Sequence, residues 1–456
     1  MLVSYSRLRL RSLSRKPRRS REKRGESGGF LNDAREAPEG LEAWLGRLAG
    51  TAAFAPLLEV PRAAQLERGY GHTLREICQQ PLTWPRTAAT MAASADRVRR
   101  VLAGGGISDR AGSMVLTGSG SSFFACECAA VPLQESLGVP ARALPAGFVL
   151  THPRAALPPV GPFLAVSLAR SGDSPESGAA VERIAGDSRA RQLLISCNGQ
   201  GALAQRYGAT PRENAAQDSS SRVESIVLPP ETNDQSLVMT SSFTNLVLAA
   251  RSLGDAASHA SQRAAQLATA ARTLLAERAG ELAALARQAY GSAVYLGSGA
   301  MTGAAHESAL KMLETNGGRV VTIADSFLGL RHGPMAAVGE DSLLVAFLSG
   351  DPVVRAYERD VLRELRRKGL GRWRLLVGAG EDIPAELAPE GQDVRLDVGP
   401  SLDDGDLALI AAVAGQLLAF FRCLHGGGRP DEPSTGVIRR VVERFAIHTH
   451  THTHGY

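Results

Sequence analysis

Lysine is nearly absent from this chain. Of the 51 basic side chains among its 456 residues, only four are lysines: Lys16, Lys23, Lys311 and Lys368. Arginine carries a rigid, permanently charged fork, whereas a lysine ammonium is a compact charge whose pKa shifts readily in a buried site. The scarcity excludes a lysine-rich surface, and it makes a lysine inside the folded part of the chain a candidate for chemistry.

Cysteine is scarce as well, and no apolar run is long enough for a membrane span. The five cysteines are scattered and form no Cys-x-x-Cys pair: Cys78, Cys126, Cys128, Cys197 and Cys423. This pattern excludes the usual zinc-binding spacing and favours reduced thiols in the cytoplasm. Because no run of 18 apolar residues occurs, the sequence predicts no transmembrane helix. We expect no metal, no cofactor and no membrane association.

The net charge of +5 is confined to the N-terminus. Residues 1–24 contain ten basic side chains and one acidic one, a net of +9, which leaves −4 for the rest of the chain. A nucleic-acid surface is therefore not expected on the folded body. Residues 1–40 have no apolar signal-peptide core, and we predict a disordered basic extension. A transit peptide and translation from an upstream start codon are the alternatives.

Short apolar runs followed by helical patterns recur along the chain. They are "MVLTGSG" (114–120), "FLAVSLARSG" (163–172), "RQLLISCNG" (191–199), "SRVESIVLPP" (221–230), "SAVYLGSG" (292–299), "GRVVTIAD" (318–325), "SLLVAFLSG" (342–350) and "RWRLLVGAG" (372–380). Uninterrupted runs of this kind are typical of strands covered on both faces. Strands that alternate with helices predict an α/β fold with parallel sheets.

The chain also repeats itself. "MVLTGSGSSFF" aligns with "AVYLGSGAMTG" at an offset of 179 residues, and "LAVSLARSGD" aligns with "LLVAFLSGD" at 178. We therefore predict two domains of one type, at 105–250 and 288–425. A helical lead-in is expected at 41–104, long connecting helices that pack one domain on the other at 251–287, and a tail at 426–456.

Two loops of the first domain are rich in hydroxyl groups. They read "GSGSS" (118–122) and "RSGDSPES" (170–177), and each stands between a predicted strand and a helix. Glycine lets the backbone approach a ligand, and helix N-termini favour anions, so the two loops predict a phosphate site. In the second domain Ala300, Met301 and Pro352 remove the hydroxyls, which indicates that only one copy kept the site. Turns that merely use serine and glycine are the alternative.

The stretch "HESALKMLETN" (306–316) predicts a helix with Glu307, Lys311 and Glu314 on one face. A solvent-exposed stripe with one Glu–Lys pair is the simple interpretation. The rarity of lysine in this chain favours a functional one.

These motifs together resemble the sugar isomerase (SIS) domain family. Four further segments narrow the resemblance to the AgaS group, which comprises tagatose-6-phosphate ketose/aldose isomerases and galactosamine-6-phosphate deaminases. They are "REICQQPLTW" (75–84), "ETNDQSLVMTSSFT" (231–244), "DSFLGLRHGP" (325–334) and "PDEPSTGVIRRVVERFAIH" (430–448). The similarity extends over about residues 68–448. It implies two SIS domains, each a five-stranded parallel sheet between helices (three layers, αβα), and a dimer or larger oligomer.

The resemblance also implies roles for individual residues. By likeness to the isomerase half of glucosamine-6-phosphate synthase, the phosphate would be held by the serines of the two loops: Ser119, Ser121, Ser122, Ser171 and Ser174. Glu314 would move a proton between C1 and C2 of the sugar. His332, from a neighbouring subunit, would open the sugar ring. Lys311 would lie beside the sugar and Asp234 near its amino end.

Three departures from that synthase limit the resemblance. A glutaminase domain with a terminal cysteine is missing, and no lysine follows Lys368 to form a C-terminal Schiff base. Transfer of ammonia from glutamine is therefore not expected. Met335 follows "HGP", where AgaS relatives commonly have lysine, so one secondary substrate contact is in doubt.

Aldose–ketose interconversion needs a base near C1 and C2, an acid or base for ring opening, and a positive charge near the developing oxyanion. Glu314, His332 and Lys311 supply these three roles. We expect an isomerase or deaminating isomerase that converts galactosamine 6-phosphate to tagatose 6-phosphate and ammonia, and the two activities are not separated by any residue named above. The alternative is a non-enzymatic sugar-phosphate regulator. Such regulators usually add a helix-turn-helix domain, whereas residues 30–70 predict only one short amphipathic helix.

The remaining histidines have simpler interpretations. His306 adjoins the helical motif, and a supporting role in the site is one possibility for it. Four isolated histidines are expected to be structural or exposed: His72, His152, His259 and His425. The final "HTHTHTHGY" predicts a disordered end that could bind a metal adventitiously.

Overall fold

A computed structural model describes residues 39–208, 222–379, 387, 393–397, 402–434, 436–440 and 446–448. The predicted basic extension, apart from its last two residues, lies outside the described residues, as does most of the final His–Thr repeat.

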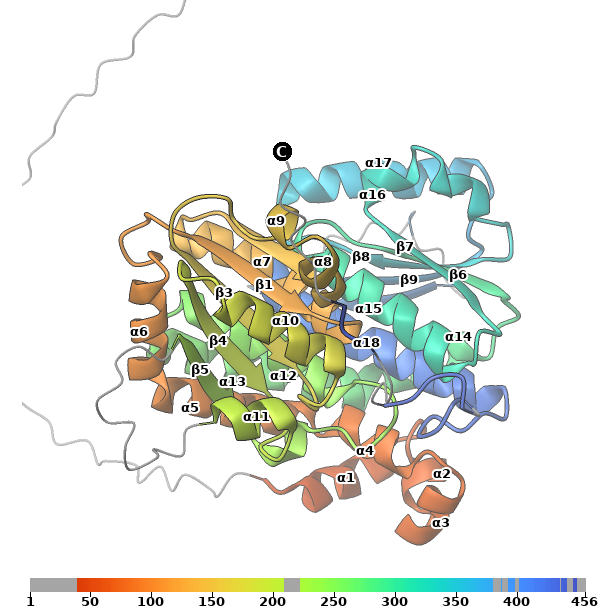
Figure 1. Ribbon diagram of the computed structural model, residues 1–456. Helices are drawn as coiled ribbons and strands as arrows, with labels where there is room; N and C mark the ends of the chain where they lie inside the picture. The colour runs from red at the N-terminus through yellow and green to blue at the C-terminus, as the bar shows by residue number, and fades with distance from the viewer. Residues whose placement is uncertain are drawn as a thin grey trace, which may run out of the picture. The chain divides into compact units, whose positions relative to one another are not determined.

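Two five-stranded sheets, each parallel throughout, form the framework of the chain (Figure 1). The first contains β1 (Ser113–Gly118), β2 (Ala141–Pro145), β3 (Phe163–Ala169), β4 (Ala190–Ser196) and β5 (Val223–Val227), in the order β2-β1-β3-β4-β5. The second contains β6 (Ser292–Leu296), β7 (Val321–Asp325), β8 (Leu343–Phe347), β9 (Trp373–Gly378) and β10 (Asp393–Asp397), in the order β10-β9-β8-β6-β7. Read from the opposite end the second order matches the first, so the prediction of two α/β units of one type is confirmed.

The burial of the strands helps to explain which of them could be predicted from the sequence. Every residue of the central strands β3 and β8 is buried, and these strands read as continuous apolar runs. The strands β2 ("ARALP") and β10 ("DVRLD") lie at sheet edges, and both were missed by the prediction. An edge strand is covered less completely, and β2 and β10 are rich in polar or small residues, whereas the other two edge strands, β5 and β7, kept enough apolar residues to be predicted.

Helices precede and surround the two sheets. Six lead into the first sheet: α1 (Leu41–Ala49), α2 (Ala55–Leu58), α3 (Arg62–Glu67), α4 (Gly71–Cys78), α5 (Gln80–Ala93) and α6 (Ala95–Gly104). The first domain contributes α7 (Ser121–Leu137), α8 (Ala146–Thr151), α9 (Pro153–Ala156), α10 (Pro175–Ala185), α11 (Ala202–Tyr207) and α12 (Ser241–Arg251). A connection follows, with α13 (Ala257–Thr273), a π-helical turn (Leu274–Arg278) and α14 (Ala279–Ala286). The second domain contributes α15 (Ala300–Thr315), α16 (Phe327–Leu330), α17 (Pro352–Arg367) and α18 (Asp404–His425).

The two domains meet chiefly through α7 and α15, whereas the connecting helix α13 packs mainly on α5. The sequence had predicted that the connecting helices make this contact. Gly303 permits the close approach, because a Cβ there would lie 2.6 Å from the Phe124 carbonyl oxygen. On its other side α15 packs against α18, where Gly415 fits against Ser308. The helix that carries Lys311 is therefore held between helices from both domains.

Among the described helices, α18 is long and apolar enough to cross a membrane by length and composition. However, 89% of its apolar stretch is buried inside the protein. A central helix covered on all sides is apolar all round, so the same composition arises in a folded core.

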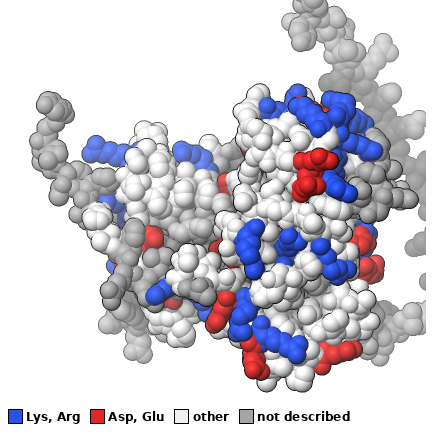
Figure 2. All heavy atoms as spheres, turned by 90° about the vertical axis from the view of Figure 1, so that its right-hand side faces the viewer, with Lys and Arg blue, Asp and Glu red and all other residues white. Residues whose placement is uncertain are grey.

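Surface charge is mixed on the side of the molecule that carries the second sheet. Figure 2 shows the Lys and Arg side chains of this face in separate groups, with Asp and Glu among them. In the second domain Arg331 and Lys368 both pair with Glu364, at 2.9 and 2.7 Å. These cations are partly neutralised by the protein itself.

Candidate active site

The hydroxyl-rich loops lie side by side, because β1 and β3 are adjacent parallel strands. Ser121 and Ser122 open α7, and each is 5% exposed, while Ser119 in the preceding loop is exposed. On the neighbouring loop Ser171 and Ser174 are partly buried. The predicted serines are thus gathered at one edge of the first sheet. This region, which contains Ser119, Ser121, Ser122, Ser171 and Ser174, is called the serine edge here.

Both helix N-termini at this edge lack a side-chain cap. The N-cap residues are Gly120 for α7, with φ of 56°, and Ser174 for α10, and neither side chain accepts a bond from its helix. The Ser174 hydroxyl instead donates to Glu176 Oε2 at 2.7 Å. The first-turn amides of both helices therefore have no side-chain acceptor, as in an anion site that uses helix N-termini.

The helix α15 brings a buried lysine to this edge from the other domain. Lys311 Nζ donates to Glu314 Oε2 at 2.6 Å and to Ser121 Oγ at 3.1 Å. Its side chain is 2% exposed, whereas that of Glu314 is 23% exposed. The predicted helical face is therefore not a solvent-exposed stripe. It joins the serine loops of the first domain to a carboxylate that a ligand can reach.

Glu307 completes the charge cluster from below. Its side chain is fully buried, and Lys311 Nζ lies 3.5 Å from its Oε1. Burial raises the pKa of Glu307 to about 7, although Lys311 opposes the shift. Burial alone lowers the pKa of Lys311, but the carboxylates of Glu307 and Glu314 outweigh it and the net pKa is raised. The lysine is thus held as an ammonium ion.

Arg170 is a site neighbour that the sequence did not single out. It directly precedes Ser171 and is 8% exposed. Its guanidinium donates to three main-chain carbonyls, those of Ser236 (3.4 Å), Leu237 (2.9 Å) and Arg440 (3.0 Å). Its place beside a predicted phosphate loop was the available signal, but its partners lie far away in sequence.

Asp234 has a structural role in the described chain. It is 1% exposed, and its carboxylate accepts backbone N–H bonds from the start of α12: from Thr240 (2.7 Å), Ser241 (3.1 Å) and Ser242 (2.9 Å). The Ser242 hydroxyl donates to it as well. Burial raises the pKa of Asp234 despite these bonds. Its contact with the amino end of a substrate stays a prediction.

The two histidines near the motif differ in environment. His332 is exposed, in the turn after α16, and no described contact joins it to Lys311 or Glu314 of the same chain. His306 Nδ1 lies 2.7 Å from Glu127 Oε2 across the α7–α15 contact. The hydrogen bond with Glu127 raises the pKa of His306. His306 therefore supports the domain contact rather than the serine edge.

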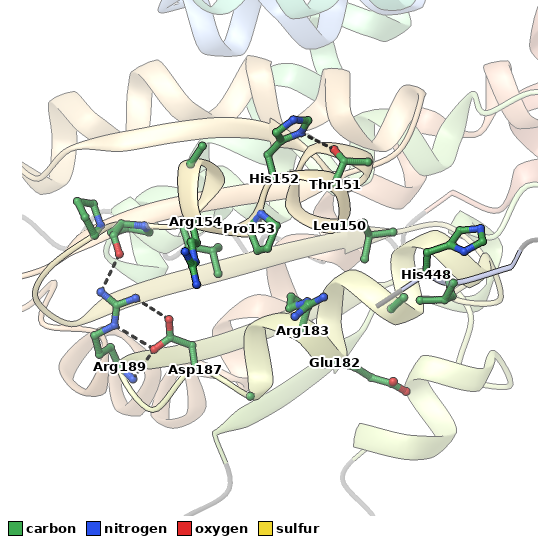
Figure 3. A pocket seen from close by; sticks show the side chains of 17 residues that line it. Leu150, Thr151, His152, Pro153, Arg154, Glu182, Arg183, Asp187, Arg189 and His448 are labelled. Atoms are coloured by element: carbon green, nitrogen blue, oxygen red, sulfur yellow. Dashed lines mark hydrogen bonds and ion pairs between the residues drawn. The ribbon is translucent and has the colours of Figure 1, made fainter. Parts of the chain in front are cut away.

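A large cavity lies elsewhere in the first domain. Figure 3 shows a cavity of about 1170 Å³ lined by α8, α9 and α10, with His152, Arg183 and His448 around it. Arg189 there pairs with Asp187 at 2.6 Å, so this charge is already neutralised. No predicted site residue lines the cavity, and size alone does not mark the candidate site.

Known proteins are similar to this chain over most of its length. An AgaS protein of Streptomyces coelicolor is 38% identical over 393 residues, which cover 83% of this chain and 95% of the relative. The Escherichia coli D-galactosamine-6-phosphate deaminase AgaS is 34% identical over 343 residues, 74% of this chain and 85% of the relative. This chain belongs to the AgaS family. The resemblance found in the sequence is thereby confirmed.

A solved structure agrees with this membership of the AgaS family. The tagatose-6-phosphate ketose/aldose isomerase of Escherichia coli superposes with a TM-score of 0.72 and 30% identity, covering 83% of this chain and 96% of the other. No family model matches the chain.

Proposed function

We propose that this AgaS protein converts galactosamine 6-phosphate and water to tagatose 6-phosphate and ammonia. The observation that carries the proposal is the position of Lys311, between Ser121 of the serine edge and Glu314 of α15. One end of this cluster suits a phosphate and the other suits proton transfer. The names of the AgaS relatives support the same substrate and product classes.

The serine edge fixes the phosphate end of the sugar. Hydroxyls of Ser121, Ser122, Ser171 and Ser174 donate to phosphate oxygens, and the uncapped N-termini of α7 and α10 add backbone donors. Anchoring one end limits the motion of the reactive carbons at the other end, which lowers the entropic part of the barrier.

Glu314 is the base in this proposal. It takes the proton from C2 of the open-chain amino sugar and returns it to C1, while the C1 oxygen gains a proton and the C2 amine loses one, so the C1 aldehyde becomes a hydroxymethyl group and C2 becomes an imine. Lys311 stabilises the negative charge that develops on the C1 oxygen. Water then adds to the imine and ammonia leaves, which makes the overall reaction a hydrolytic deamination.

His332 opens the sugar ring from a neighbouring subunit in this proposal, and the active form is a dimer or larger oligomer. The test mixes two inactive variants, Glu314→Gln and His332→Ala, under conditions that allow subunit exchange. A mixed dimer then has one site with both lesions and one intact site, so up to about a quarter of full activity returns. No recovery after proven exchange places both residues in the site of one chain.

One assay tests the reaction itself. The protein is incubated with galactosamine 6-phosphate, and ammonia and ketose phosphate are measured together. Equal amounts of both support deamination, whereas interconversion of galactose 6-phosphate and tagatose 6-phosphate, with no ammonia released from galactosamine 6-phosphate, supports simple isomerisation. Binding without turnover supports a sugar-phosphate regulator.

A non-enzymatic sugar-phosphate regulator would not need a buried Lys–Glu pair beside the serine edge. In residues 30–70, where one helix was predicted, α1 is followed by α2 and α3 of four and six residues, so that prediction was incomplete.

All five cysteines are unpaired and buried, which supports a reducing compartment, and we place the protein in the cytoplasm.

A further inference from the structure

The "PDEPSTG" segment, which the proposed function does not use, is firmly attached to the protein. Residues 431–434 and 436–440 are called the C-terminal strap here. Asp431 begins it, and its carboxylate accepts backbone N–H bonds from His72 (3.1 Å) and Thr73 (2.7 Å) at the start of α4. The Asp431 carbonyl accepts a further bond from Leu237 N at 3.0 Å. These bonds fix one end of the strap.

The strap then passes the end of the helix that carries Glu314. The Pro433 carbonyl lies against Gly317, where an added Cβ would be 3.5 Å from its oxygen. At the far end Arg170 Nη2 donates to the Arg440 carbonyl at 3.0 Å. Because Arg170 directly precedes Ser171, the strap runs from the end of α15 to the start of a serine loop. It therefore borders the candidate site on one side.

Arg440 places a second guanidinium close to Arg170. Its Nη2 donates to Asn233 Oδ1 at 2.8 Å, and its buried Nε has no hydrogen-bond partner among the described residues. The charged groups that act on Arg170 are Asp234, Glu76, Glu314 and Arg440. Burial lowers the pKa of Arg170, and the like charge of Arg440 lowers it further. Arg440 thus adds a second positive charge near Arg170, at the side of the candidate site that the strap borders.

Two neighbouring guanidinium groups are stabilised by an anionic or oxygen-rich partner. The substrate class of the proposed function supplies such a partner, since a sugar phosphate carries both phosphate and hydroxyl oxygens. Arg440 is only partly buried and can be reached by a ligand, whereas Arg170 uses its guanidinium on main-chain carbonyls. The two arginines therefore have different tasks.

We propose, on the basis of the proposed function, that Arg440 donates to an oxygen of the bound sugar phosphate and helps to select this substrate class. Arg170 is a positioning residue that holds the strap, and with it Arg440, beside the serine loops.

The test measures the affinity for tagatose 6-phosphate by calorimetry, together with KM and kcat for galactosamine 6-phosphate. The main variant is Arg440→Gln, which keeps most of the length of the side chain and can still donate to Asn233. The matched control is Arg439→Gln, the exposed neighbour on the same strap. We expect Arg440→Gln to weaken binding and raise KM about tenfold or more, the loss of one charge-assisted hydrogen bond. The control stays within about twofold.

A positional readout separates this role from a structural one. At saturating substrate kcat is expected to change much less than KM, and Arg440→Lys restores part of the affinity because it keeps the charge without the fork. Wild-type affinity in a folded Arg440→Gln variant overturns the inference, and so does an equal loss in the control. A wild-type protein that binds neither sugar phosphate overturns the proposed function and this inference together.

Discussion

The two domains have the same pair of loops but satisfy the amides at the helix start after the second loop, that of α10 and of α17, in different ways. In the first domain α10 has no side-chain cap, and the carboxylate of Asp173 is turned away, accepting from Ala202 N at 2.8 Å. In the second domain the corresponding Asp351 caps its own helix, with Oδ1 accepting from Val353 N (2.8 Å) and Val354 N (3.0 Å). One helix start is left for an external anion, and the other is occupied by the chain itself.

A second carboxylate of the protein also accepts hydrogen bonds from this loop of the second domain. Asp404, in the first turn of α18, accepts from Gly350 N at 2.6 Å and from the Ser349 hydroxyl. A carboxylate in this position satisfies the donors that a phosphate would otherwise use. The second-domain loop therefore differs by more than its missing serines, since the protein's own carboxylates accept the hydrogen bonds of this loop.

The helices α7 and α15 also differ between the two domains. At the offset of 179 residues, Lys311 and Glu314 on α15 correspond to Pro132 and Glu135 on α7. Because α7 and α15 pack against each other, the lysine of the second domain meets the serine edge of the first. Each domain thus contributes one half of the candidate site.

The largest expected effect is on kcat, and it distinguishes Glu314 from Glu135, the carboxylate at the matching position of the first domain. Glu314→Gln keeps the shape and hydrogen bonding of the side chain but removes the base, so kcat should fall by about 10²-fold or more while substrate still binds. The matched variant is Glu135→Gln on α7, which should leave kcat unchanged. Steady-state kinetics on both variants decides the point, and a Glu314→Gln enzyme with near-normal turnover would assign the base to another group.

A smaller effect is expected from the two sets of loops. Ser122→Ala with Ser171→Ala removes two phosphate donors and should raise KM by about tenfold or more. Ser349→Ala in the second domain should lower thermal stability, because Asp404 loses a partner, but leave KM unchanged. Equal KM values in both variants would remove the first-domain loops from the phosphate site.

A substitution of Asp404 tests whether its carboxylate stabilises the second domain. Asp404→Asn keeps the size of the side chain but weakens its bonds to Ser349 and Gly350, at a cost of about 1 kcal/mol. For a protein of this size we expect Tm to fall by about 2 °C, without a change in kcat. Asp360→Asn on the exposed face of α17, as the control, should leave Tm unaltered. If both variants melt with the wild type, Asp404 contributes nothing measurable.

The smallest effect concerns the pair that joins the domains at matching positions. Glu127 and His306 are 179 residues apart and bond to each other across α7 and α15. Because the folded protein has the higher pKa for His306, the pair stabilises fully below the unfolded pKa of about 6.5 and loses this effect as pH rises through the raised value. We expect His306→Gln to destabilise by about 0.5 kcal/mol at pH 6 and by less at pH 9, measured by urea unfolding. A cost that does not depend on pH would show packing rather than charge.

The sequence alone was enough to identify the architecture and most of the serine edge. Strands buried on both faces have uninterrupted apolar sequences, and the repeat at 179 residues indicates two copies of one unit. The serine loops follow β1 and β3, and neighbouring parallel strands bring their carboxyl ends to the same edge. These inferences need only local pattern and chain order, which is why they survive without coordinates.

The tertiary structure decided which groups meet. Ser121 and Lys311 are 190 residues apart, and no local pattern states that their side chains come within 3.1 Å. The same holds for Arg170, whose three acceptors belong to two distant segments. It holds for Asp234, whose carboxylate caps α12 instead of facing an open site. Burial, charge pairing and hydrogen-bond satisfaction depend on every element packed around a group, so they are properties of the folded chain rather than of any stretch of its sequence.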